Sequence, residues 1–180
     1  MKRSLSICLL LLCVLASSAQ IQSNFFSFTL GETTMKEVYY YLEEKQYDIT
    51  NNPINEGFMI NNKMKFADCV WSKVLFTFYD NKLYCISFYD DESNTPKTIL
   101  DDKFVKVSKY LNDRYLSYCN GNEPDSKIYS DAKVFLGFER QYNDGKTYIL
   151  LNFMSVPLMD KKRKSSIMDK IKNEVIVSDY

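Results

Sequence analysis

The 180-residue chain balances 23 basic against 23 acidic side chains, has no histidine, and is 46% hydrophobic and 15% aromatic. Such a composition is too apolar for a disordered chain, and the missing histidine excludes His-based triads, His general bases and the commonest zinc sites. With 5 glycines and no Gly-x-Gly-x-x-Gly or Gly-Lys-Ser/Thr motif, the sequence offers no phosphate-binding loop, and we expect no cofactor.

Residues 1–19 have the layout of a secretory signal peptide. Lys2-Arg3 supply the positive start, 5–15 form an almost unbroken apolar run, and small side chains lead up to Ala19. Because this run is shorter than the roughly 20 residues that span a bilayer, we expect cleavage before Gln20 rather than a transmembrane anchor. The sequence thus predicts an exported protein, either periplasmic or extracellular.

The predicted signal peptide carries two basic residues and no acid, so its removal leaves 21 basic and 23 acidic side chains, a net charge of −2. A nucleic-acid partner would require a strong basic excess, and we expect none. The mature chain is long enough for a single α+β domain over 20–157 with a helical tail at 158–180. It contains no second apolar stretch of membrane-spanning length.

Three cysteines remain in the mature chain: Cys69, Cys85 and Cys119. Because the number is odd, at least one thiol is free or pairs between chains. No Cys-x-x-Cys spacing occurs, so the sequence indicates neither a redox motif nor a zinc knuckle, and we expect no bound metal. Burial as small hydrophobic residues and a single disulfide of undetermined pairing are both open.

The first half of the mature chain contains a helix with a clear start. Thr34 and Glu37 have the spacing of a capping box, in which hydroxyl and carboxylate each satisfy a backbone N–H. Val38 and Leu42 follow at helical spacing. Together these residues predict a helix over 34–46.

A hairpin with strands at 73–79 and 83–89 follows in the same half. Apolar and polar side chains alternate in both strands around the short polar turn at 80–82. One face carries the heavier apolar load, so we expect it to pack on helices. Further extended segments are expected at 24–30, 47–50, 57–61 and 64–70, with a turn at 51–53.

The polar segment 90–96 is the expected connection to the second half. An amphipathic pattern then predicts a helix over 97–118. Asn120-Gly121-Asn122 would end this helix, because Asn and Gly tolerate left-handed backbone angles. The remaining predicted elements are strands at 133–142 and 146–155 around the tight turn 143–145, and a final helix within 158–173.

The two halves share an apolar pattern. Val74–Phe78 matches Val134–Phe138, and Leu83–Phe88 matches Tyr148–Phe153. The sequence therefore predicts an α+β fold in which an antiparallel sheet carries helices on one face, built from two tandem helix-plus-hairpin units. The expected half-repeats are 24–90 and 96–156.

Leu30-Gly31-Glu32-Thr33-Thr34, followed by Val38 and Leu42, resembles the helix opening of the BamE/SmpA-like and β-lactamase-inhibitor-protein-like (BLIP-like) superfamily, and Lys65 to Ile86 resembles its strand block. The mature chain also resembles small exported Bacteroidetes proteins of uncharacterised families. The resemblance implies helices on an antiparallel sheet and a non-enzymatic role, as an envelope-assembly accessory or a protein-binding inhibitor. It also implies association with the outer membrane, although the lipobox of the lipoprotein members is missing.

Three acidic clusters are the candidates for carboxylate chemistry. Glu43-Glu44 is expected on a solvated helix face, and Asp101-Asp102 near a helix start, where the dipole favours negative charge. Asp90-Asp91-Glu92 lacks the alternating ligands of a calcium loop. Since a glycosidase needs two carboxylates across a cleft and nothing in the sequence gathers reactive groups in one place, we assign no catalytic residue. An extracytoplasmic hydrolase that uses carboxylates is the alternative function.

Aromatic and basic residues point to binding instead. Tyr39-Tyr40-Tyr41 is a candidate for sugar stacking, although consecutive helix positions point in different directions. Lys161-Lys162-Arg163-Lys164 is either a contact for anionic lipid or a solvated helix face. Trp71, the single Trp, is either a core anchor or an interface hot spot. With Tyr79 and Tyr89 it makes the interaction surface that we predict for a non-catalytic module binding another envelope or secreted protein.

Overall fold

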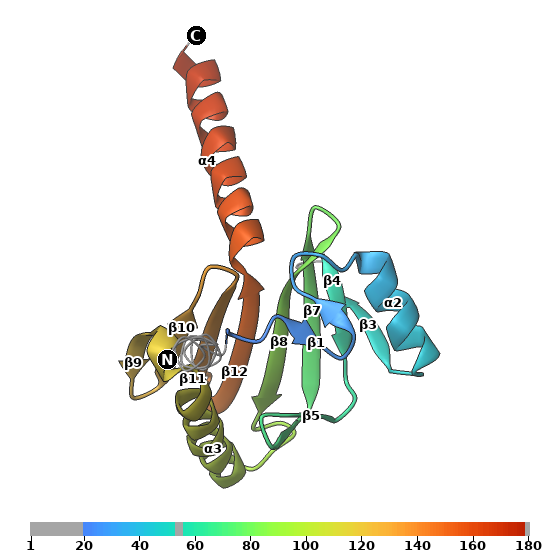
Figure 1. Cartoon of the computed structure of the whole chain (residues 1–180), viewed down its shortest axis with the longest axis vertical. Coiled ribbons are helices and arrows are strands. Elements are labelled where there is room, and N and C mark those ends of the chain that lie inside the picture. The colour runs from blue at the N-terminus through green and yellow to red at the C-terminus, as the bar shows by residue number, and fades with distance from the viewer. Residues whose placement is uncertain (1–19, 53–55, 179–180) are drawn as a thin grey trace, which may run out of the picture.

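The computed structural model of the chain describes residues 20–52 and 56–178. The predicted signal peptide at 1–19 and the end of the predicted turn at 51–53 lie outside the described residues. The described chain folds into a strongly curved sheet with helices at its borders (Figure 1). The elements in chain order are β1 (Asn24–Phe25), β2 (Phe28–Thr29), α2 (Met35–Glu44), β3 (Ile49–Asn52), β4 (Gly57–Ile60), β5 (Met64–Phe66), β6 (Cys69–Trp71), β7 (Lys73–Tyr79), β8 (Lys82–Asp91), α3 (Lys97–Tyr115), a 3-10 turn (Leu116–Tyr118), β9 (Cys119–Glu123), β10 (Ser126–Ser130), β11 (Val134–Asn143), β12 (Lys146–Ser155) and α4 (Val156–Ser178).

One antiparallel sheet of eight strands organises the molecule, in the order β3-β4-β7-β8-β12-β11-β10-β9. Helix α2 precedes the first four of these strands in sequence, and α3 precedes the other four. The two groups meet where β8 pairs with β12, with Phe88 opposite Leu151. The predicted α+β class is therefore confirmed, and each unit contributes four strands to the common sheet rather than one hairpin.

The predicted capping box starts α2. The backbone N–H of Glu37 donates to Thr34 Oγ1 at 3.3 Å, and the backbone N–H of Thr34 donates to Glu37 Oε2 at 2.7 Å. Shortly before the helix, Gly31 has a φ of +82°, and a Cβ at this position would lie 2.9 Å from Ser155 Oγ. Glycine is required here because the chain turns and passes close to β12 before α2 begins.

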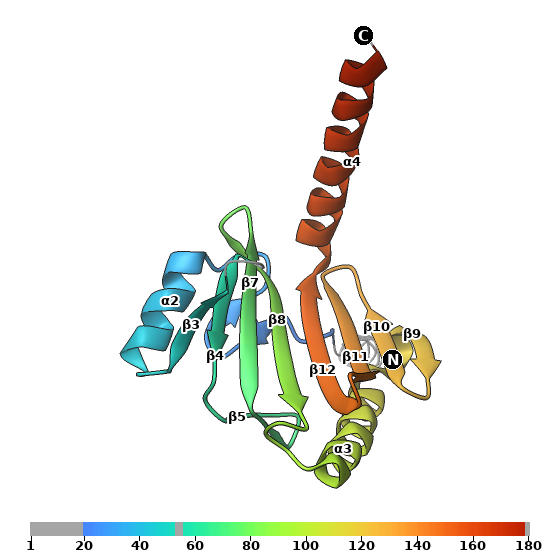
Figure 2. The ribbon, with the colours of Figure 1, turned by 180° about the vertical axis from the view of Figure 1, so that it is seen from behind.

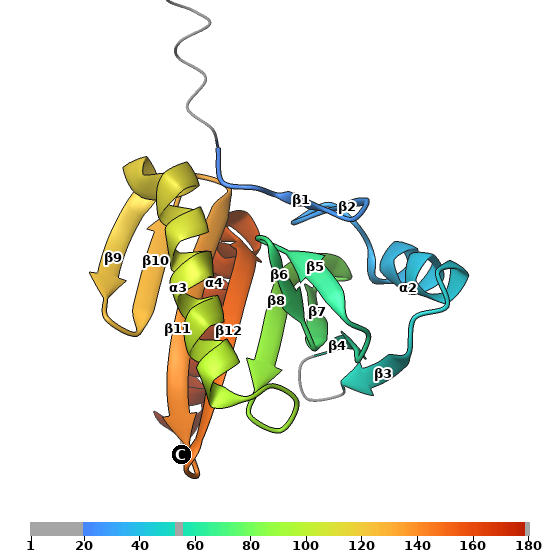
Figure 3. The same ribbon diagram turned by 90° about the horizontal axis from the view of Figure 1, so that it is seen from below.

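The core lies between one face of the sheet and a cover of α2, α3 and the hairpins β1–β2 and β5–β6 (Figure 3). Phe66 of β5 stacks on Phe88 of the sheet with ring centroids 4.5 Å apart, and Phe104 of α3 stacks on Phe138 at 4.7 Å. The matching apolar patterns of the two halves both face this core. Its buried sheet residues include Val74, Phe76, Phe78, Ile86, Phe88, Val134, Leu136, Phe138, Ile149, Leu151 and Phe153.

Some predicted segments are wrong in detail. The single strand expected at 64–70 is the hairpin of β5 and β6, because Ala67 and Asp68 have φ values of 51° and 57° and reverse the chain. The helix end expected at 120–122 is strand β9, paired with β10, which the sequence analysis missed. The helix ends instead at Tyr115 and continues as the 3-10 turn.

Helices and strands of the described chain leave the opposite face of the sheet open except at one end, where α4 begins (Figure 2). Helix α4 begins directly after β12 and runs away from the body (Figures 1 and 2). Its Lys161 pairs with Asp80 in the turn between β7 and β8. Its Lys162 lies over the rings of Tyr79 and Tyr84, 5.9 and 5.2 Å from their centroids. These contacts join α4 to one end of the uncovered face and leave the rest open.

Candidate functional site

The uncovered sheet face consists mostly of half-buried side chains in cross-strand rows. The middle row combines Leu75 with small and polar residues around Ser87, and the rows on either side include aromatic and long aliphatic side chains. A Cβ at Gly137 would lie 3.4 Å from the ring of Phe135, so this ring packs over the glycine. Read from β7 to β11, three neighbouring rows are Lys73-Tyr89-Leu150-Glu139, Leu75-Ser87-Asn152-Gly137 and Thr77-Cys85-Met154-Phe135.

Two residues of this face other than glycine are buried. Cys85 is 7% exposed and Ser87 is 9% exposed, because larger neighbours close over them, and Cys85 Sγ lies 3.3 Å from Ser87 Oγ. Burial raises the pKa of the Cys85 thiol to about 11. Since the thiolate is the reactive form, this cysteine acts as a small packed side chain. Cys85 therefore contributes no reactive thiolate to this face.

Of the three residues of the predicted interaction surface, one lies in the core and two lie on the uncovered face. Trp71 is 0% exposed, so its place in that surface is corrected: its indole N–H donates to the carbonyl of Phe66 at 3.1 Å, and the ring packs in the core. Tyr79 and Tyr89 are half-buried on the uncovered face, Tyr79 beneath Lys162 and Tyr89 beside Lys73. The period-two alternation of β7 and β8 identifies the face on which Tyr79 and Tyr89 lie. The residues next to Trp71 do not indicate whether its side chain is buried or exposed.

Burial dominates the chemistry of Tyr89. It raises the pKa of this phenol to about 12, and a hydrogen bond to Asp91 adds to the shift. The ring lies 5.3 Å from Lys73 Nζ and 6.1 Å from the ring of Tyr148. Tyr89 is therefore neutral at physiological pH, and it offers an aromatic surface with a polar edge, as tyrosines in protein interfaces commonly do.

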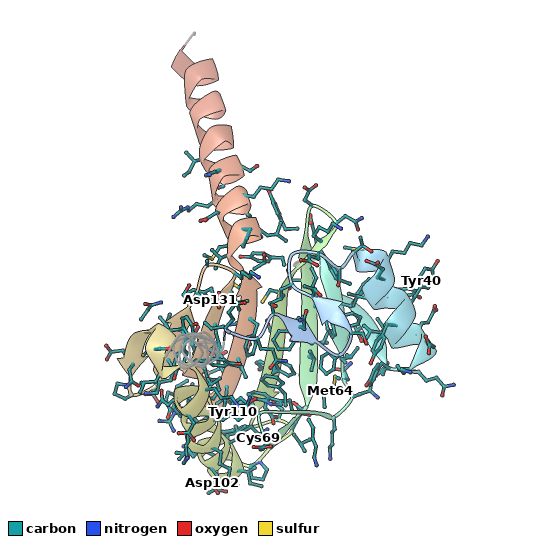
Figure 4. The ribbon with its side chains drawn as sticks, in the orientation of Figure 1. Tyr40, Met64, Cys69, Asp102, Tyr110 and Asp131 are labelled. Atoms are coloured by element: carbon teal, nitrogen blue, oxygen red, sulfur yellow. The ribbon has the colours of Figure 1, made fainter. Side chains whose placement is uncertain are left out.

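A second feature is a cavity of about 680 Å³ between the hairpin β5–β6, the end of β8 and the first turns of α3. Figure 4 shows two of its lining residues, Cys69 and Asp102, where α3 meets that hairpin. Apolar side chains from both walls, Val70 and Ile99, line it together with charged ones. Several ionisable side chains thus share one cavity, contrary to the expectation that reactive groups are not gathered in one place.

An ion pair between Asp90 and Lys103 forms the inner wall of the cavity, and the two side chains are 2% and 7% exposed. Asp90 Oδ1 also accepts hydrogen bonds from Ser72 Oγ at 2.9 Å and Thr95 Oγ1 at 2.8 Å. Lys103 Nζ donates to the carbonyl of Val70 at 2.6 Å and lies 5.1 Å from the ring of Trp71. These bonds compensate both charges, and the pair connects α3 to β6 and β8.

One signal in the sequence indicates this pair. Lys103 stands between Leu100 and Val107 on the apolar stripe of α3, and both neighbours are 0% exposed. A charged residue inside a buried stripe requires a partner of opposite charge. The partner, Asp90, stood in the segment that the sequence analysis took for a polar connection, so its burial was missed.

The other acidic and aromatic candidates do not converge. Asp68 and Asp102 are the other carboxylates of the cavity, and both are exposed. Tyr39 packs on Phe58 with centroids 5.6 Å apart, whereas Tyr40 is 56% exposed and points outward from α2 (Figure 4). The cavity therefore lacks the pair of desolvated carboxylates that a glycosidase requires.

The three cysteines of the described chain are free thiols, two buried and one, Cys119, partly exposed. No group of three or more His, Cys, Asp or Glu side chains within residues 20–52 and 56–178 is placed to hold a metal ion. In the same residues, none of the helices is both long and apolar enough to span a bilayer. Comparison of the chain with protein-family models, with curated proteins and with solved structures finds no match.

Proposed function

We propose that the chain is an exported, non-catalytic module that binds another envelope or secreted protein through the uncovered face of its sheet. The observation that carries this proposal is an eight-stranded sheet that packs one face in the core and leaves most of the other face uncovered. An antiparallel sheet can leave one face to water, but solvated faces are usually polar. Here that face carries Leu75, Leu150, Met154 and Phe135 in a half-buried state.

The size of the face fits a protein partner. Strands about 4.8 Å apart make the eight-stranded sheet about 34 Å wide. Neighbouring strands share about six residue pairs on average, which gives about 20 Å of height. The product, about 700 Å², is close to the roughly 800 Å² that each partner buries in a standard protein–protein interface. A small ligand would use a fraction of this area.

The chemistry of the face favours a partner that is apolar at the centre of its contact surface and polar at the border. Leu150 and Tyr89 lie side by side across β12 and β8, and charged residues, Lys73 and Glu139, close the same row. Protein interfaces have this arrangement of an apolar and aromatic centre with a polar rim. The resemblance to a superfamily of assembly accessories and protein-binding inhibitors supports the same role.

The test is affinity capture of envelope and secreted proteins with three forms of the tagged protein. Leu150→Lys places a charge in the centre of the uncovered face. Val105→Lys is the matched control, because Val105 is 67% exposed on α3, on the covered side of the sheet. A partner retained by the wild-type chain and Val105→Lys, and lost by Leu150→Lys, is expected. A partner retained equally by all three would refute the proposed surface, as would hydrolysis in a broad substrate screen without any partner.

A further inference from the structure

We propose that the cavity between hairpin β5–β6 and α3 is a binding site for a short peptide with free termini and an apolar side chain. This goes beyond the contact surface proposed above, because the cavity lies on the covered side of the sheet, and of the residues in the rows named above only Lys73 lines it. Its volume of about 680 Å³ is within the range of about 300–1,000 Å³ that is typical of ligand pockets.

Two apolar side chains are exposed to solvent inside the cavity. Val70 on β6 and Ile99 on α3 are 44% and 52% exposed, and both line the cavity. Such residues are normally scattered singly on a surface. Two that line one cavity from opposite walls provide a contact for an apolar side chain of a ligand.

Unpaired charged side chains of both signs line the cavity. Each wall offers one ammonium and one carboxylate: Lys63 and Asp68 on the hairpin side, Lys106 and Asp102 on α3. All four side chains are exposed. Within the described residues none of them has an oppositely charged group within 4.0 Å, although Asp102 and Lys106 are spaced for a helical i,i+4 pair.

The charge pattern favours a ligand that carries both signs. At the inner wall, the charges of Asp90 and Lys103 compensate each other. Charged groups of a ligand find unpaired partners at the rim, where both signs are available. A zwitterion with an apolar middle fits this pattern, and a tripeptide, about 10 Å long when extended, presents one charge at each end and a side chain between them.

The probe is the tripeptide Ala-Leu-Ala with free termini, titrated into the purified full chain at low ionic strength. Two signals report binding: heat in calorimetry, and the emission of Trp71, the only Trp in the chain, whose ring lies 5.1 Å from the cavity residue Lys103. We expect a saturable change in both. Exposed charge contacts contribute about 0.2–1 kcal/mol each, so acetylation or amidation of one terminus should weaken binding by a factor of about 1.4 to 5.

Matched variants on α3 locate the site. Ile99→Ala should weaken binding about fivefold, as expected for a lost contact of about 1 kcal/mol. Val105→Ala, on the same helix but outside the cavity, should leave it unchanged. Because both side chains are exposed, both variants should fold, and circular dichroism checks this.

Three results would overturn the proposal: no saturable signal up to the solubility of the peptide, equal affinity for the doubly blocked peptide, or equal weakening by Ile99→Ala and Val105→Ala. Leu150→Lys, which disrupts the proposed protein-binding face, should bind the peptide like the wild type. The failure of one proposal is therefore distinguishable from the failure of the other.

Discussion

The buried ion pair between Asp90 and Lys103 gives the sharpest prediction about stability. In Asp90→Asn the shape is kept, but the ammonium of Lys103, 7% exposed on its side chain, loses its counter-charge. Breaking a buried pair from one side costs about 3–5 kcal/mol, because the remaining charge is left uncompensated. We therefore expect Asp90→Asn to lower the free energy of unfolding by about 3–5 kcal/mol.

Removing the charge of Lys103 instead should lower the free energy of unfolding by a smaller amount. In Lys103→Met the carboxylate of Asp90 still accepts from Ser72, Thr95 and the backbone N–H of Asp91 at 2.8–3.1 Å. These neutral donors compensate part of the charge, so we expect a loss of about 2–3 kcal/mol. The double variant removes both charges, and its loss should be smaller than the sum of the single losses by about 2–3 kcal/mol, the upper part of the range for coupled neighbours.

Urea denaturation of the four proteins measures this coupling. The control is the exposed pair of Lys109 and Asp113 on the same helix, whose side chains are 76% and 61% exposed. The same cycle there should give about 0.3–0.5 kcal/mol. A coupling below about 0.5 kcal/mol for the buried pair, or a loss below about 1 kcal/mol for Asp90→Asn, would refute the reasoning.

Three further predictions concern the sheet. A Cβ at Gly57 would lie 2.0 Å from the carbonyl oxygen of Phe76, so Gly57→Ala should cost at least about 1–3 kcal/mol in urea denaturation. Gly121→Ala, with its nearest atom at 3.5 Å, should cost less than half of that, and equal losses would contradict the close approach. Asp144 has a φ of 50° in the turn between β11 and β12, so Asp144→Ala should cost about 1 kcal/mol and Asp144→Gly should not; equal melting temperatures would contradict this. The pKa of Cys85 is raised to about 11 from an ordinary 9.0, so the native state keeps a proton that the unfolded chain loses. The contribution of this thiol to the free energy of unfolding is complete below pH 9 and is lost by about pH 11, at about 1.4 kcal/mol per pKa unit. Cys85→Ala should flatten this part of the pH–stability curve, and an unchanged curve would contradict the assignment.

Local signals were sufficient for the helix α2 and the two long hairpins. Thr34 and Glu37 define a helix start through bonds made within one turn, and the alternation of β7 and β12 records directly which side chains face the core. Such elements can be predicted because their determinants lie within a few residues of one another.

The remaining differences depend on strand pairing, backbone angles and ion pairing that the residue types of each segment do not indicate. Strand β9 reads Cys-Asn-Gly-Asn-Glu and is an edge strand, so only its pairing with β10 makes it extended. Ala67 adopts a left-handed angle in a tight turn, which its residue type does not favour. Asp90 is buried only because α3 places Lys103 beside it. In all three cases the residue types of the segment itself favour another structure, and the one signal for the third case is Lys103 within an apolar stripe.

The central claim is that the uncovered sheet face meets a partner protein. The most direct measurement is photo-crosslinking in the producing cells, with a photoreactive phenylalanine analogue at Leu150 on that face or, as the control, at Val105 on α3. The account predicts a discrete crosslinked protein from position 150 and none from position 105. Crosslinks from position 105 alone, or none from position 150 while a partner is still captured, would contradict it.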